Sequence, residues 1–144
     1  MNQILIVFIV YVLCQTAKFF LRLASSDSKD LDKRALWVYL WAGGVPSAHS
    51  AILVSSLYFV YREVGTAPLF VFCAITAIIL MYNLVADRER EEIRKKIFNF
   101  KNPASGAASI EKRVLDISGH TFFDIATGVL FGFLATVVLE KILY

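Results

Sequence analysis

The sequence has few of the residues that build disulfide frameworks or metal clusters. Its 144 residues include two cysteines and two histidines. Cys14 and Cys73 both lie within apolar stretches, which indicates packing positions and neither a disulfide nor a metal site. The net charge is only +3, and the basic residues alternate with acidic ones beside apolar stretches. This charge pattern argues against nucleic acid as a partner.

Long apolar stretches dominate what the sequence does contain. Hydrophobic residues make up 58% of the chain, and its mean hydropathy is +0.62. Runs of about 18 or more apolar residues are typical of membrane spans. We therefore predict an all-α integral membrane helical bundle, a single membrane domain of residues 1–144 with about four transmembrane helices. The predicted spans cover about residues 4–23, 47–62, 67–86 and 121–139, and the second is short enough to begin inside the membrane.

Two shorter segments are expected between these spans. The run ALWVYLWA at residues 35–42 is too short to cross a membrane, and its aromatic residues suit an interfacial or re-entrant segment. The charged stretch that begins at Asp87 has helical spacing and is expected to extend the third helix beyond the membrane. Apolar residues at 110, 114 and 117 predict a short interfacial helix before the last span.

The basic residues are distributed unevenly between the two ends of the predicted spans. Most lie in the loops of about residues 24–46 and 87–118, whereas the opposite side has only Arg62 and Lys141. The positive-inside rule therefore predicts that both loops are cytoplasmic and that the N- and C-termini are outside. Anionic membrane lipids are the expected partners of the loop cations.

Polar residues occur where the spans begin and end. His49 and His120 each follow a small residue at the predicted start of a helix, where unpaired N–H groups and the helix dipole favour phosphate. Pro46 or Ser47 is expected to begin the first of these helices, and Ser118 is a candidate cap for the second. The glycine pair at residues 43 and 44 suits a sharp turn and close backbone approach.

Charged residues within spans are costly and point to function. Lys18 lies in the first span, and Asp124 follows His120 by four residues, which places both side chains on one helix face. With Arg88 at the end of the third span, all of these groups reach the same side of the predicted bundle. Two histidines, a carboxylate and fixed cations together indicate phosphoryl chemistry, in which one imidazole attacks and the other protonates the leaving oxygen.

These residues resemble motifs of the type 2 phosphatidic acid phosphatase superfamily. Pro46-Ser47-Ala48-His49 is similar to its Pro-Ser-x-His motif, and His120-x3-Asp124 to the end of its third motif. The chain most resembles the divergent bacterial and plant branch, over about residues 15–132. The matching features are Gln15-x-x-Lys18, Gly43-Gly44-Val45-Pro46-Ser47-Ala48-His49-Ser50, Met81-Tyr82 followed by Arg88, and Gly119-His120-Thr121.

The resemblance implies a role for each site residue. His120 would be the nucleophile that forms a phosphohistidine, Asp124 would accept a hydrogen bond from its far ring nitrogen, and His49 would be the general acid. The remaining positions would bind the substrate phosphate: Lys18, Ser47, Arg88, Arg90 and Gly119. The superfamily's phosphatases need no metal, and the resemblance implies no cofactor. It also points to a bacterial-type plasma membrane.

The chain departs from the superfamily at several phosphate-binding positions. Ser25-Ser26 stand where the first motif usually has Arg-Pro, and Val114, beside Arg113, stands where the third usually has arginine. Asn83 follows Tyr82 where the divergent branch usually has aspartate. The resemblance implies that the branch supplies its arginine after the third span, which makes Arg88 and Arg90 the candidates.

Three hypotheses are compatible with the sequence. The first is a phosphatase acting on phosphatidic acid, phosphatidylglycerophosphate or a polyprenyl phosphate. The second is a lipid-phosphate binding or transport protein that keeps the phosphate pocket without turnover, and the third is a purely structural bundle. Gly128 and Gly132 form a Gly-x3-Gly pattern that allows close helix packing either within the chain or in a homodimer.

Overall fold

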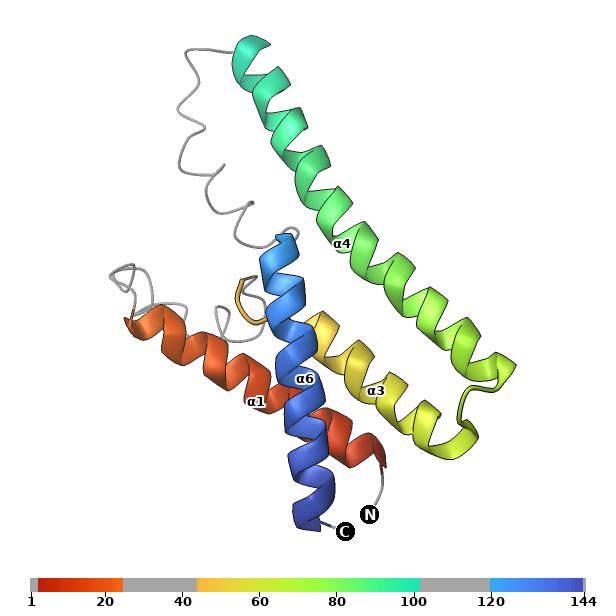
Figure 1. The fold of residues 1–144 in the computed structure, drawn as a ribbon. Helices are drawn as coiled ribbons and strands as arrows, with labels where there is room; N and C mark the ends of the chain where they lie inside the picture. Colours follow the sequence, from red (N-terminus) through yellow and green to blue (C-terminus); the bar gives the residue numbers. More distant parts are fainter. Residues whose placement is uncertain (1–2, 25–43, 102–119, 144) are drawn as a thin grey trace.

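A computed structural model describes residues 3–24, 44–101 and 120–143 of the chain. Within these ranges it contains four α-helices and no strand. They are α1 (Gln3–Ala24), α3 (Ala48–Val64), α4 (Pro68–Lys101) and α6 (Phe122–Leu143) (Figure 1). The predicted all-α helical bundle is confirmed. The predicted segments at residues 35–42 and 110–117 lie outside the described residues.

Three of these helices are long and apolar enough to cross a membrane. The candidate spans are Gln3–Leu21, Pro68–Arg94 and Phe122–Leu143. Large apolar side chains such as Ile4, Phe72 and Ile78 are mostly exposed, as lipid-facing residues of a membrane protein are. At 17 residues, α3 is shorter than the three candidate spans, and it covers the short second span expected from the sequence. As predicted, the charged stretch after Asp87 continues the helix, and α4 reaches Lys101.

The helix α3 occupies the centre of the arrangement, because it contacts α1, α4 and α6 (Figure 1). The core is formed mainly between α1 and α3. Ile6, Val10 and Cys14 of α1 and Ala51 of α3 are fully buried there, and Phe59 of α3 is nearly so. Burial of each large apolar side chain contributes on the order of 1.5–3 kcal/mol where the alternative is water. Within the membrane, close packing and van der Waals contact supply the stabilisation instead.

The pair α3 and α6 run side by side from a common starting end, and small residues set their spacing. A Cβ atom at Gly128 would lie 2.3 Å from the Ser47 carbonyl oxygen, and one at Gly132 would lie 2.5 Å from that of Ala51. Both contacts would be with backbone atoms, so only glycine fits at these two positions without moving a helix. The Gly-x3-Gly pattern therefore allows close packing within the chain.

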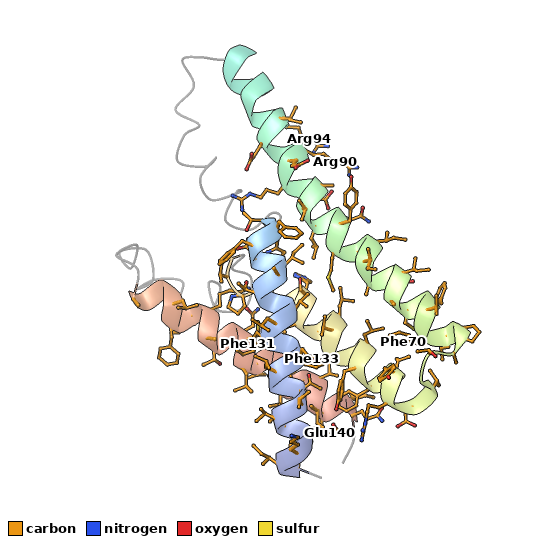
Figure 2. All side chains as sticks on the ribbon, viewed as in Figure 1. Phe70, Arg90, Arg94, Phe131, Phe133 and Glu140 are labelled. Atoms are coloured by element: carbon orange, nitrogen blue, oxygen red, sulfur yellow. The ribbon has the colours of Figure 1, made fainter. Side chains whose placement is uncertain are left out.

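Polar contacts continue this interface along its length. One turn beyond Gly132, the Thr136 and Ser55 hydroxyls share a buried hydrogen bond of 2.5 Å. Near the end of α6, Glu140 accepts a hydrogen bond from the Tyr58 hydroxyl and pairs with Arg62 at 3.3 Å (Figure 2). These contacts hold the far ends of α3 and α6 together. As a result, the two helix N-termini, which carry the histidines, are fixed at the opposite end.

Candidate active site

The start of α3 is built by the glycine and serine residues of the motif. Gly44 has a φ of 114°, a conformation that residues with a side chain rarely adopt. Ser47 is the N-cap of α3, and its hydroxyl accepts a hydrogen bond from the Ser50 backbone N–H at 3.4 Å. The Ser47 backbone N–H in turn donates to the Asp124 carbonyl at 3.0 Å. The expected start of this helix is confirmed, and it is joined directly to the first turn of α6.

The start of α6 differs from the expectation. The helix begins at Phe122, and Thr121 caps it, so Ser118 is not the cap. The Thr121 hydroxyl accepts from the Asp124 backbone N–H at 3.1 Å, while the Asp124 carboxylate accepts from the Thr121 backbone N–H at 2.7 Å. This reciprocal pair is a capping box, which satisfies two backbone donors at once. His120 therefore precedes the helix and lies outside its first turn.

The two histidine rings are in direct contact. Nδ1 of His49 lies 3.3 Å from Nε2 of His120, and the ring centroids are 5.5 Å apart. His120 is buried at 5% exposure, whereas His49 is exposed. The backbone N–H of His120 donates to the Leu84 carbonyl of α4 at 3.1 Å, which holds this residue between α4 and α6. Residues separated by 71 positions thus form one imidazole pair.

Cations from two further helices act on this pair. Lys18 of α1 is buried at 4% exposure. Arg88 of α4 lies one helical turn after Leu84, whose carbonyl binds His120, and its Nε pairs with Glu92 at 3.2 Å. Burial lowers the pKa of His120 to about 4, and the positive charges of His49, Lys18 and Arg88 act in the same direction, whereas Asp124 opposes them. His120 is therefore neutral at pH 7, the form in which an imidazole attacks.

Asp124 is close to His120 but does not make the expected hydrogen bond. Among the described residues, Nδ1 of His120 has no hydrogen-bond partner, although it is buried. The Asp124 carboxylate instead completes the capping box with Thr121. The physical reason is local, because a carboxylate three residues after the cap is well placed to accept from the cap's backbone N–H. The effect of Asp124 on His120 in this structure is thus the electrostatic one described above.

The other predicted phosphate-binding residues divide into three groups. Ser47 is fully buried, and its hydroxyl contacts Ser50. Arg88 lies with the site, whereas Arg90 is exposed and pairs with Asp87 at 3.2 Å on another face of α4 (Figure 2). Gly119 lies outside the described residues, as does Arg113. Within the part of the chain that the structure describes, no three His, Cys, Asp or Glu side chains are grouped as a metal site requires.

Two site features were not found by the sequence analysis. The Leu84 carbonyl that binds the His120 backbone has no sequence signal, because every residue carries a carbonyl. The capping box did have one, since Thr121-x-x-Asp124 is a hydroxyl residue followed three positions later by a carboxylate before an apolar run. The sequence analysis instead expected the Asp124 carboxylate to pair with His120.

The arrangement can now be compared with known proteins. The sequence matches the profile of the Divergent PAP2 family over residues 1–135. The chain belongs to this family. In the Divergent PAP2 family, as the name states, the relationship to type 2 phosphatidic acid phosphatases is a distant one, so membership supports a phosphatase-related function. No curated protein and no solved structure shows a significant match to the chain.

Proposed function

We propose that this protein is an integral membrane phosphatase that removes a terminal phosphate from a lipid through a phosphohistidine. The observation that carries the proposal is the contact between Nδ1 of His49 and Nε2 of His120 at 3.3 Å. A contact that served only for packing would not require two imidazoles, one at the start of α3 and the other at the start of α6. Membership of the Divergent PAP2 family and the cations Lys18 and Arg88 add support.

The proposed reaction has two steps. In the first, Nε2 of His120 attacks phosphorus, the bond from phosphorus to the lipid oxygen breaks, and His49 gives its proton to that oxygen. In the second, water attacks the phosphohistidine, His49 takes a proton from the water, and the P–N bond breaks to release inorganic phosphate. A phosphate held by both rings has to open their direct contact of 3.3 Å, so substrate binding moves at least one ring.

The remaining residues would support these steps by charge and orientation. Lys18 and Arg88 would bind the phosphate oxygens and stabilise the charge that develops on them. When Nε2 attacks, the ring proton of His120 is on Nδ1, and we assign Asp124 as its acceptor. For this, the Asp124 carboxylate has to turn from the Thr121 backbone towards the ring. The mechanism needs no metal at any step.

The charge distribution supports a site on the cytoplasmic face of a bacterial-type plasma membrane. Phosphatidic acid and phosphatidylglycerophosphate are inner-leaflet substrates of this kind, whereas a polyprenyl phosphate is the alternative for a site on the outer face. A binding or transport protein is the second candidate function. It is favoured by the use of the Asp124 carboxylate as a helix cap and by the uncharged Asn83.

The deciding experiment measures inorganic phosphate released from phosphatidic acid in detergent micelles that contain a metal chelator. We expect release by the wild type, none by His120→Ala, and wild-type release by Thr76→Ala, whose hydroxyl bonds only within α4. Vanadate, which adopts five-coordinate geometry, should compete with the substrate. Equal release by wild type and His120→Ala would rule out the phosphatase, and substrate binding without any release would establish the second function.

A further inference from the structure

A second feature of the bundle lies well away from the histidine pair. Near the start of α1 and the end of α3, a cavity of about 420 Å³ opens between α1, α3 and α4. Its walls are mainly apolar side chains: Ile4 and Val7 of α1, Phe59 and Val60 of α3, and Leu69 of α4. The polar residues Gln3 and Glu63 also line it and are joined by a hydrogen bond of 2.6 Å.

The cavity and the site share one face of α3. Ser56, which lines the cavity, follows His49 by seven residues, and Val60 follows Ser56 by four. Residues at these spacings lie above one another on a helix. The opposite face of α3 carries Ser47, Ala51 and Ser55, which pack against α6. His49 and Ser56 are both exposed, so a molecule bound at His49 can extend along this face of α3 towards the cavity without meeting α6.

The distance between His49 and the cavity suits a lipid tail. At a rise of about 1.5 Å per residue, Ser56 lies roughly 10 Å and Val64 roughly 22 Å beyond His49 along the helix axis. A hydrocarbon core about 30 Å thick gives each leaflet a depth of about 15 Å. A chain attached to a phosphate at His49 thus reaches the near part of the cavity when it spans one leaflet. The Gln3–Glu63 hydrogen bond lies towards the far end, where α1 starts and α3 ends.

We propose that this cavity, here called the tail cavity, binds the end of the substrate's hydrocarbon chain and so selects phosphates carried on a long chain. The proposal rests on the proposed function, because it takes the histidine pair as the site of the phosphate. It adds a binding site formed by Val60 and Leu69, remote from the reacting atoms. Apolar walls with few polar groups are what a hydrocarbon ligand requires.

The test separates tail binding from simple partition into detergent. Hydrolysis of butyl phosphate and hexadecyl phosphate is measured for the wild type, for Val60→Trp, which fills the tail cavity, and for Val71→Trp. Val71 is an exposed residue of α4 that does not line the cavity, so it is the matched control. Partition into micelles is the same for all three proteins. Any change in chain-length dependence therefore arises in the protein.

We expect Val60→Trp to raise KM for hexadecyl phosphate by about tenfold or more, in line with the effect of small volume changes in apolar pockets. Its KM for butyl phosphate and both values for Val71→Trp should stay at the wild-type level. Leu69→Trp, from the opposite wall, should reproduce the effect if Val60→Trp does not fold. If Val60→Trp leaves both KM values unchanged, or changes both equally, the tail cavity does not bind the substrate's chain. Bulk bilayer lipid would then occupy it.

Failure of the proposed function gives a different result. If the wild type hydrolyses neither phosphate, the phosphatase is excluded while the tail cavity is still tested by binding. Binding of hexadecyl phosphate is then measured by calorimetry, and Val60→Trp should weaken it by about tenfold relative to Val71→Trp. Equal affinity of these two variants would overturn the tail cavity on its own.

Discussion

His49 and His120 touch each other, yet their surroundings differ sharply. His120 is enclosed between α4 and α6, and its backbone is bonded to Leu84, so its ring is held in place. His49 lies in the first turn of α3 and is exposed, so water or a leaving oxygen can reach it. In the proposed mechanism His120 is the nucleophile and His49 the acid, and a two-step phosphoryl transfer needs such a fixed nucleophile beside an accessible acid.

This division predicts that the two histidines respond differently to the leaving group. His49→Ala should lose about 100-fold or more in kcat with an alkyl phosphate, which needs protonation to leave. With p-nitrophenyl phosphate its first turnover should release nitrophenolate at close to the wild-type rate, because nitrophenolate leaves without a proton, whereas hydrolysis of the phosphohistidine should slow because His49 is its base. His120→Ala should lose the first turnover with both substrates. Rapid-mixing measurement of nitrophenolate release checks this, and loss of the first-turnover release in His49→Ala would contradict the assignment of His49 as the acid.

The pH dependence follows from the low pKa of His120. Because that pKa is about 4, His120 stays neutral and reactive well below 6.5, the usual value for histidine, and we expect the acid limb of kcat/KM to lie near pH 4. The free energy of unfolding also decreases as the pH is lowered. The unfolded chain binds the proton below about 6.5 and the folded protein does not, so stability falls as the pH is lowered from 6.5 towards 4.

One variant separates the titration of His120 from the titration of the substrate. The substrate titrates in the same way with every variant of the protein. Asp124→Asn keeps an oxygen that can accept from the Thr121 backbone, so the cap is retained while the negative charge is lost. Since Asp124 raises the pKa of His120, its removal should move the acid limb to still lower pH. An acid limb that coincides in the two proteins would show that it does not report His120.

At the scale of helices, the close approach of α3 and α6 sets the position of the imidazole pair. Gly128→Ala would place a Cβ atom 2.3 Å from the Ser47 carbonyl, and Ser47 is both the cap of α3 and two residues from His49. We expect a loss of about 1–3 kcal/mol in stability and a large loss of activity, because the two N-termini have to separate. Leu130→Ala, on the exposed face of α6, is the matched control.

Thermal unfolding in detergent and phosphate release together check this prediction. Gly132→Ala should have a similar effect through Ala51, one turn further along the interface. If Gly128→Ala unfolds with a midpoint close to that of Leu130→Ala and keeps full activity, the interface is looser than the distances indicate. Its contribution to catalysis would then be small.

Helices of this protein were easier to predict than the hydrogen bonds that join them. The apolar runs and the charged extension after Asp87 identified α1, α4 and α6, because membrane spans follow from local composition. The motif also predicted that α3 starts at Pro46 or Ser47, since proline and serine mark helix starts, and Ser47 is its cap. The sequence did not predict that the Asp124 carboxylate accepts from the Thr121 backbone in this structure, because two acceptable donors lie nearby and only the three-dimensional geometry chooses between them. The bond from His120 to Leu84 depends on how α4 lies against α6, which no local pattern encodes.

For the molecule as a whole, the two ends of the bundle differ in charge, and only one of them carries the histidine pair. The start of α1 and the end of α6 lie at the same end of the bundle (Figure 1), whereas the histidine pair lies at the other, where α3 and α6 begin. The charged part of α4, which begins at Asp87, extends from the histidine end, and it has more basic than acidic residues. The site and this basic extension therefore share one side of the membrane, whichever side that is.

The positive-inside rule predicts that this shared side is the cytoplasm. Cysteines introduced at exposed positions can test it with a membrane-impermeant maleimide in intact cells. Lys141→Cys, near the end of α6, should react at once, whereas Glu89→Cys, on the exposed face of α4, should react only after the cells are permeabilised. The wild type, with Cys14 buried and Cys73 partly buried in α4, supplies the background. The reverse labelling pattern would put the histidine pair on the outer face, and the substrate would then be a lipid phosphate of the outer leaflet, such as a polyprenyl phosphate.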